Sequence, residues 1–205
     1  MTVVADKDHR AAEGGSRRLI LDEAARLLRE GGYHQTTLRE IAEAVGIRKA
    51  SLYYHFASKE EIVEAVVNDG VRFVHEAVAA ALAAHDGAPP RERLEAAIRA
   101  HLDALHGHGD YTSASIKVFS FGRAQVSDSV RRVRRAYEEI WRGLVGELQQ
   151  AAILPPERSP DMLRLFVLGA LNSSIDWYRA DRFDLAELAR ECAALVAPEN
   201  ALDLR

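Results

Sequence analysis

The sequence predicts an all-α protein of nine helices, and three observations support this. Apolar residues recur with helical spacing, and β-branched runs that alternate with period two are missing. Glycine, proline and capping residues fall at intervals that divide the chain into helix-length segments. The hydrophobic share of 48% over 205 residues suffices for the core of one large or two small domains.

Local stop and start signals set the expected helix boundaries. Gly31–Gly32 should end the first helix, and Thr37 to Glu40 and Ser58 to Glu61 are capping boxes that open two others. Residues 1–15 are expected to form a flexible N-terminal arm. The predicted helices span about 17–30, 38–45, 49–55, 59–84, 90–106, a shorter segment ending near 121, 128–152, 160–180 and 184–197.

Composition limits the class of protein. A single cysteine, Cys192, rules out an internal disulfide and is expected to be a small core residue. No apolar run approaches the roughly 18 residues of a membrane span, and the start lacks the apolar centre of a signal peptide. A cytoplasmic protein without cofactor is expected.

Charge gives only weak support for a nucleic-acid partner. The net charge is −4, and residues 1–60 hold 10 Lys and Arg against 9 Asp and Glu. If DNA is bound, a few local contacts must bind it. Arg10, Arg17 and Arg18 are candidates for phosphate or minor-groove contacts, although a solvated arm explains them equally well.

The segment "TTLREIAEAVGIRKASLYYHF" combines a helix, a glycine turn and a second helix, which is helix-turn-helix geometry. Apolar residues such as Ile41, Leu52 and Phe56 are spaced to bury one common face. Without base contacts the segment would be a helical hairpin with a tyrosine-rich surface. The residues expected to face outward, with donors that suit phosphates and base edges, are Arg48, Lys49, Ser51, Tyr53, Tyr54 and His55.

The continuation "SLYYHFASKEEI" resembles the motif of TetR/AcrR-family regulators, and the match covers residues 16 to 62 in order. The resemblance implies that Thr37 caps the second helix and touches a phosphate, and that Tyr53 and Lys59 bind phosphates on either side of the groove. Lys49, Tyr54 and His55 would contact bases or backbone. Arg48 departs from the small residue usual in the family, which adds a cation and leaves the operator sequence open.

The resemblance also implies the domain organisation and the partners. Residues 16–62 would form the DNA-binding domain, and residues 63–205 would bind a ligand and form a homodimer through the last two helices. Such a dimer would bind a palindromic operator in double-stranded DNA as a repressor and leave it when a small-molecule effector binds.

The helix predicted over 128–152 places aromatic and aliphatic residues on one side and arginines (Arg131, Arg135 and Arg142) on the other. This pattern is either a core face and a solvated face, or an aromatic-lined tunnel with a cationic mouth. The ligand-site candidates are Phe119, Phe121, Tyr137, Trp141, Asn172 and Trp177. Asn172 and Trp177 also suit a core or an interface.

The segments "RRAYEEIWRGLV" and "LGALNSSIDWYR" are similar to TetR regulators of fatty-acid or steroid catabolism that respond to acyl-CoA thioesters, although "RADRFD" replaces the glycine turn of that family. The resemblance thus implies an acyl-CoA effector. A TetR-type repressor of an efflux pump that senses lipophilic drugs is the alternative function.

The sequence gives little support for an enzyme or for a metal site. A helical-bundle enzyme is the remote alternative, because no catalytic motif is present. "HLDALHGHGD" carries His101, His106, His108 and Asp110, but the spacing fits no closed metal site. We expect no metal and interpret this segment as a solvated loop.

Overall fold

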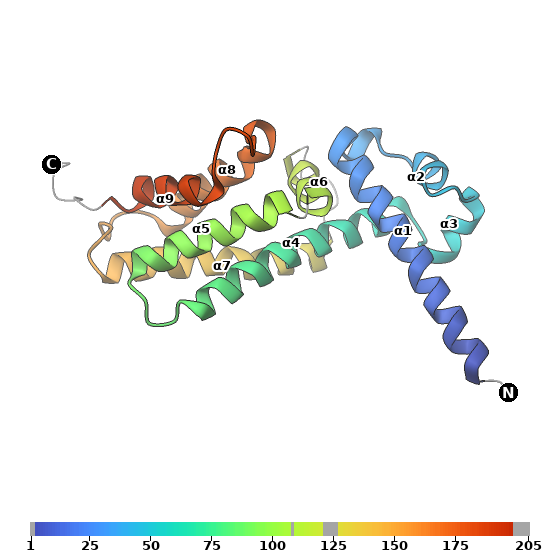
Figure 1. The fold of residues 1–205 in the computed structure, drawn as a ribbon, viewed down its shortest axis with the longest axis horizontal. Coiled ribbons are helices and arrows are strands. Elements are labelled where there is room, and N and C mark those ends of the chain that lie inside the picture. The colour runs from blue at the N-terminus through green and yellow to red at the C-terminus, as the bar shows by residue number, and fades with distance from the viewer. Residues whose placement is uncertain (1–2, 108, 121–126, 199–205) are drawn as a thin grey trace. The chain divides into compact units, whose positions relative to one another are not determined.

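The computed structural model describes residues 3–107, 109–120 and 127–198, and these form nine helices without a strand (Figure 1). The prediction of an all-α protein is confirmed. The helices are α1 (Val3–Gln35), α2 (Leu38–Val45), α3 (Lys49–His55), α4 (Lys59–Ala84), α5 (Pro90–Gly107), α6 (Gly109–Ser120), α7 (Asp128–Gln150), α8 (Pro160–Trp177) and α9 (Leu185–Val196).

The first helix differs most from the prediction. It begins at Val3, whereas the amphipathic pattern predicted a start near Arg17, so residues 3–15 are helical where an arm was expected. Gly32 interrupts the helical geometry with φ 70° and ψ −176°. The break expected at the two glycines is therefore present, but helical backbone resumes and continues to Gln35.

Two compact units make up the chain. Unit 1 comprises Met1–Gly70 and Asp110–Val130, and unit 2 comprises Val71–Gly109 and Arg131–Arg205. The unit boundary falls inside α4 after Gly70, and α6 belongs almost entirely to unit 1. None of the helices in the described ranges is long and apolar enough to cross a membrane.

In unit 1, α1 packs against α2, and α2 packs against α3. The apolar residues that the sequence placed on a common face of the helix-turn-helix include Ile41, Leu52 and Phe56, and all three are buried. The guanidinium of Arg17 lies 4.7 Å from the centre of the Phe56 ring. This packing holds the short α3, which is too short to be stable alone.

Helix α6 approaches α4 closely at Gly70. A β-carbon at this position would lie 2.4 Å from the carbonyl oxygen of Tyr111, so only glycine fits. The Tyr111 hydroxyl donates to a carboxylate oxygen of Asp22 in α1 at 2.7 Å. Both contacts fix α6 within unit 1.

Unit 2 has one apolar core to which α4, α5, α7, α8 and α9 contribute. Helix α5 packs against both α8 and α9, and Figure 1 shows α5 and α9 side by side. The largest fully buried side chains include Trp141, Leu102 and Leu144. The core therefore surrounds the aromatic face of α7.

Candidate nucleic-acid interface and ligand site

The turn between α2 and α3 depends on Gly46. This residue adopts the left-handed conformation (φ 77°, ψ 28°), which glycine reaches at little cost. The Gly46 amide donates to the carbonyl of Glu43, and the Ile47 amide donates to the carbonyl of Ala42 at 2.9 Å. These bonds end α2 and direct the chain into α3.

Thr37 forms the predicted capping box with Glu40. The Glu40 amide donates to Thr37 Oγ1 at 3.2 Å, and the Thr37 amide donates to Glu40 Oε2 at 2.8 Å. The Thr37 hydroxyl also donates to the same carboxylate at 2.9 Å. Thr37 is exposed, so the start of α2 is both capped and open to a partner.

Helix α3 buries Leu52 and turns a polar surface outward. Tyr53 and Tyr54 are 49% and 75% exposed, which is unusual for aromatic residues that serve only packing. His55 is half-buried, with its ring 5.3 Å from that of Tyr54 in an edge-on arrangement. The exposed residues of this surface are Arg48, Lys49, Ser51, Tyr53 and Tyr54.

The first turn of α3 carries two cations. Arg48 occupies the N-cap position without a side-chain hydrogen bond to the helix, as its substitution for a small residue predicts. The ammonium of Lys49 lies 5.9 Å from the centre of the Tyr53 ring. Both cations are exposed, so they present positive charge beside the tyrosines.

Lys59 stands at the start of α4 and is tied to α1. Its ammonium donates to the carbonyl oxygen of Tyr33 at 2.5 Å and lies 4.0 Å from the centre of the Tyr33 ring. This partial burial lowers the pKa of Lys59. The Tyr33 hydroxyl donates to Glu60 Oε1 at 2.9 Å. Lys59 thus has a structural role, with donors left over for a phosphate.

The second predicted capping box, at the start of α4, takes a modified form. The Glu61 amide donates to Ser58 Oγ at 3.2 Å, as expected, but the Glu61 carboxylate accepts from the amide of Ala57 at 2.7 Å.

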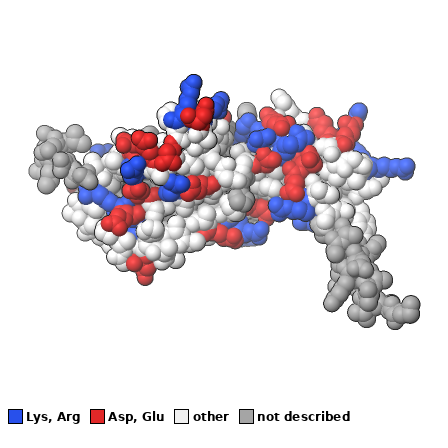
Figure 2. Space-filling model, viewed as in Figure 1, with Lys and Arg blue, Asp and Glu red and all other residues white. Residues whose placement is uncertain are grey.

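Figure 2 shows basic and acidic residues interspersed over the face in view. Positive charge on the face in view is therefore local, as the composition indicated.

In unit 2, Tyr137 and Trp141 of α7 meet His101 of α5. Tyr137 Oη and His101 Nδ1 are 2.5 Å apart, and their rings are nearly parallel. The Trp141 ring lies edge-on to His101, with ring centres 6.0 Å apart. Burial lowers the pKa of His101 to about 4, although nearby Asn172 of α8 acts in the opposite direction. Burial also raises the pKa of Tyr137, so both groups are uncharged near neutral pH.

Two atoms of this group have no hydrogen-bond partner among the described residues. They are His101 Nε2 and Trp141 Nε1, and both are buried. Because an unpartnered buried donor costs about 1–3 kcal/mol, such atoms call for an explanation. We call His101, Tyr137, Trp141 and Asn172 the aromatic cluster.

The aromatic cluster does not account for the other predicted ligand-site residues. Trp177 is 45% exposed, and its indole donates to Ser173 Oγ at 3.3 Å within α8. Phe119 is half-buried in α6, which belongs to unit 1. Phe121 lies outside the described residues. The structure thus brings together three of the six candidates, Tyr137, Trp141 and Asn172.

The interpretation of residues 101–110 as a solvated loop is wrong, because α5 continues to Gly107 and α6 begins at Gly109, and His101 is only 3% exposed in the core. His106 Nε2 lies 2.9 Å from Ser174 Oγ, and Asp110 pairs with Arg29 at 3.0 Å. His108 lies outside the described residues. In the described part of the chain, no group of three or more His, Cys, Asp or Glu side chains could hold a metal. The helical spacing of His101 with Leu94, Ile98 and Leu105 could have indicated its burial.

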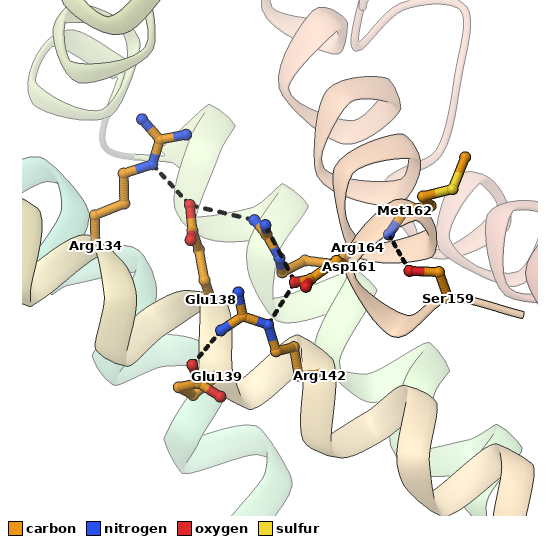
Figure 3. A network of polar contacts seen from close by, with 8 residues as sticks. All are labelled: Arg134, Glu138, Glu139, Arg142, Ser159, Asp161, Met162 and Arg164. Carbon is orange, nitrogen blue, oxygen red and sulfur yellow. Dashed lines mark hydrogen bonds and ion pairs between the residues drawn. The ribbon is translucent and has the colours of Figure 1, made fainter. Parts of the chain in front are cut away.

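An ion-pair network between α7 and α8 also escaped the sequence analysis (Figure 3). The Arg164 side chain, 8% exposed, pairs with Glu138 at 3.2 Å, and Glu138 also accepts from Arg134 at 2.8 Å. Arg142 pairs with Asp161 at 2.6 Å and with Glu139. Arg164 is the single charged residue between Met162 and Ile175. Its isolation in an apolar helix could have indicated a buried ion pair.

Comparison with known proteins gives concordant matches. Residues 20–66 match the model of the N-terminal domain described as bacterial regulatory proteins of the tetR family. Residues 87–198 match the Tetracyclin repressor-like C-terminal domain.

Among curated proteins, the chain is similar to the HTH-type transcriptional repressor KstR2 of Mycobacterium tuberculosis. The two are 28% identical over 177 residues, which cover 84% of this chain and 86% of that protein.

Among solved structures, the chain is similar to AibR in complex with isovaleryl coenzyme A and operator DNA. The TM-score is 0.76 and the identity 26%, with 89% of this chain and 98% of that chain covered. The regulator PfmR of Thermus thermophilus gives a TM-score of 0.71 and 28% identity over 87% of this chain and 96% of that chain. Because the C-terminal model alone covers more than half of the chain, this protein belongs to the TetR family of bacterial regulatory proteins.

Proposed function

We propose that the protein is a ligand-responsive transcriptional repressor whose homodimer binds a palindromic operator and is released by a small-molecule effector. The observation that carries the proposal is the outward surface of α3, where exposed tyrosines and cations stand on a buried apolar face. Side chains of this kind donate to phosphates and base edges. The KstR2 relative is named a transcriptional repressor, and the AibR structure contains operator DNA.

A dimer through the last two helices is supported by the exposed apolar residues of α8. Met162, Leu165 and Phe166 are 59%, 57% and 72% exposed, and Leu195 of α9 is 83% exposed. Solvent exposure of several large apolar side chains on one helix indicates an interface. A two-fold dimer would place two α3 helices about 34–36 Å apart or a multiple of that distance, to match successive turns of DNA.

The dimer proposal is tested by Phe166→Glu, which places a charge among these exposed apolar residues of α8. We expect the variant to sediment as a monomer and to lose tight operator binding. Leu19→Glu is the matched control, because Leu19 is a 57% exposed leucine of α1. A dimeric Phe166→Glu variant would refute this interface.

Effector binding is proposed to reach α3 through α4. This helix begins with Lys59, which is tied to Tyr33, and its later residue His75 lies 6.2 Å from the Tyr137 ring, centre to centre. A ligand at the aromatic cluster would therefore lie beside α4, which carries Lys59 and follows α3 in the chain. Coupling energies of about 1–3 kcal/mol are typical and would lower operator affinity 5- to 150-fold.

The DNA-binding proposal is tested by titrating the protein with DNA from the promoter beside its own gene, at several salt concentrations. Lys49→Ala and Lys59→Ala should each weaken binding to all sequences and reduce the salt slope by about one. Thermal unfolding of each variant controls for stability. An unchanged slope in Lys59→Ala would leave Lys59 with only its structural role at Tyr33. No specific binding, even after selection from random DNA, would refute the proposal.

A further inference from the structure

The aromatic cluster contains two unpartnered buried nitrogens on neighbouring rings from different helices. Trp141 Nε1 always carries a hydrogen, so it is a donor without an acceptor. His101 Nε2 is a donor or an acceptor, depending on which ring nitrogen carries the proton. The chemistry that the cluster recognises therefore depends on the tautomer of His101.

The hydrogen bond to Tyr137 assigns this tautomer. If the Tyr137 hydroxyl donates to His101 Nδ1, the proton of the imidazole sits on Nε2, and one donor of the pair is left unsatisfied. If Nδ1 donates instead, both the hydroxyl hydrogen and the Nε2 lone pair are left in the core. Because each buried unsatisfied group is costly, the first arrangement is favoured. His101 Nε2 then carries a hydrogen and is a second unpartnered donor.

The surroundings of these donors exclude a charged partner. The His101 and Tyr137 side chains are uncharged at neutral pH, and the core that contains Tyr137 and Trp141 includes the apolar residues Leu102, Leu144 and Leu171. A carboxylate in this environment would lose its hydration without gaining a cation. An uncharged acceptor, such as a carbonyl oxygen, accepts N–H donors without that cost.

We propose that His101 and Trp141 form the polar recognition point of the effector site and donate hydrogen bonds to a carbonyl group that is joined to an apolar chain of the ligand. This inference rests on the proposed function and specifies the effector as a thioester, ketone or ester, in contrast to a free acid. Tyr137 positions the donor by holding His101 in the Nε2–H tautomer. The Asn172 side chain of α8, whose polar interaction with His101 raises the pKa of the imidazole, lies near this donor without forming a hydrogen bond to Nε2.

The test compares ligands that differ only in the carbonyl. Binding of straight- and branched-chain acyl-CoA thioesters, including isovaleryl-CoA, is measured by calorimetry beside the S-alkyl-CoA thioethers in which CH₂ replaces C=O. The wild-type chain should prefer the best thioester over its thioether by about 5- to 150-fold, the range expected when a buried donor gains its acceptor. Equal affinity for the two would overturn the proposal, and this arm needs no variant.

Variants then locate the donors. Trp141→Phe and His101→Met each remove one N–H and should reduce the thioester preference about fivefold or more. Trp177→Phe is the matched control, because its N–H already donates to Ser173, and it should keep the full preference. If only Trp177→Phe reduces the thioester preference, or if none of the three variants reduces it, the carbonyl binds elsewhere and the assignment is overturned.

Operator binding separates this inference from the function on which it rests. If the chain binds its operator but binds no thioester of the panel, the carbonyl assignment is overturned for this ligand class and the DNA-binding proposal stands. If no operator is found, the proposed function fails, whatever the ligand result. Intact operator binding by Trp141→Phe shows that this variant is folded.

Discussion

Residues 37–58 keep their polar side chains near the surface, whereas unit 2 buries His101 and Arg164 almost completely. In the first region the hydrogen bonds are local, as in the pairing of Thr37 with Glu40 three residues later. In the second they join distant segments, since His101 and Tyr137 are 36 residues apart. Polar groups of the first kind present a surface to a partner. Those of the second kind hold helices together and surround a candidate ligand site.

The largest expected effect tests the buried ion pair. Glu138→Gln would leave the Arg164 guanidinium, 8% exposed, without its main counter-charge. Breaking a buried pair by removing one partner costs about 3–5 kcal/mol, and we expect a loss in the lower part of this range because Asp161 lies 3.7 Å from Arg164. Urea denaturation measures the free energy of unfolding.

The matched control is Glu139→Gln, one residue along the same helix. The Glu139 side chain is 63% exposed and pairs with Arg142 at the surface. Exposed ion pairs contribute about 1 kcal/mol or less, so this variant should be nearly neutral. Equal losses in the two variants would remove the distinction between buried and exposed pairs in unit 2.

The second effect is a pH dependence from His101. Its pKa is about 4 in the folded chain, and an unperturbed histidine titrates near 6.5. Between these values the unfolded chain binds a proton that the folded chain does not, so stability falls as the pH is lowered from 6.5 to 4. The shift corresponds to roughly 3 kcal/mol.

Urea denaturation at pH 7 and at pH 4.5, in wild type and in His101→Gln, measures this contribution. We expect the stability difference between the two pH values to be smaller in the variant, because glutamine does not titrate. His85→Gln, which removes an exposed histidine, should keep the wild-type difference. If His101→Gln keeps the same stability difference between pH 7 and pH 4.5 as the wild type, His101 is not the group that makes stability depend on pH.

The next effect concerns the close approach of α4 and α6. Gly70→Ala would place a β-carbon 2.4 Å from the backbone oxygen of Tyr111. This contact can be relieved only if α4 or α6 shifts, because the oxygen belongs to the helix backbone. We expect a loss of about 1–3 kcal/mol in unfolding free energy. Gly143→Ala in α7 meets no atom within 4 Å and should gain up to about 1 kcal/mol from its higher helix propensity. A neutral Gly70→Ala variant would show that α6 shifts freely.

The distinction between local contacts and contacts of distant segments explains what could be predicted from the sequence. The starts of α2 and α4 were predicted because their capping side chains lie within four residues of the helix starts, and the end of α2 and the approach to α3 were predicted from the Gly46 turn. The early start of α1 was missed because residues 3–15 carry no amphipathic stripe. Tyr137 and Trp141 were selected from the periodicity of one helix. Their partner His101 and the pairing of Arg164 with Glu138 come from other helices, and spacing along the chain does not encode such contacts.

The smallest effect tests the local character of the first region. Thr37→Ala removes the hydroxyl that caps α2 and should cost about 1 kcal/mol, whereas Thr37→Ser keeps the hydroxyl and should be nearly neutral. Because Thr37 and Glu138 belong to different units and bond to different residues, the double variant Thr37→Ala with Glu138→Gln should lose the sum of the two single losses within about 0.5 kcal/mol. A larger deviation, measured by the same urea denaturation, would mean that the cap and the buried pair are energetically coupled, and the two regions could then no longer be treated as independent.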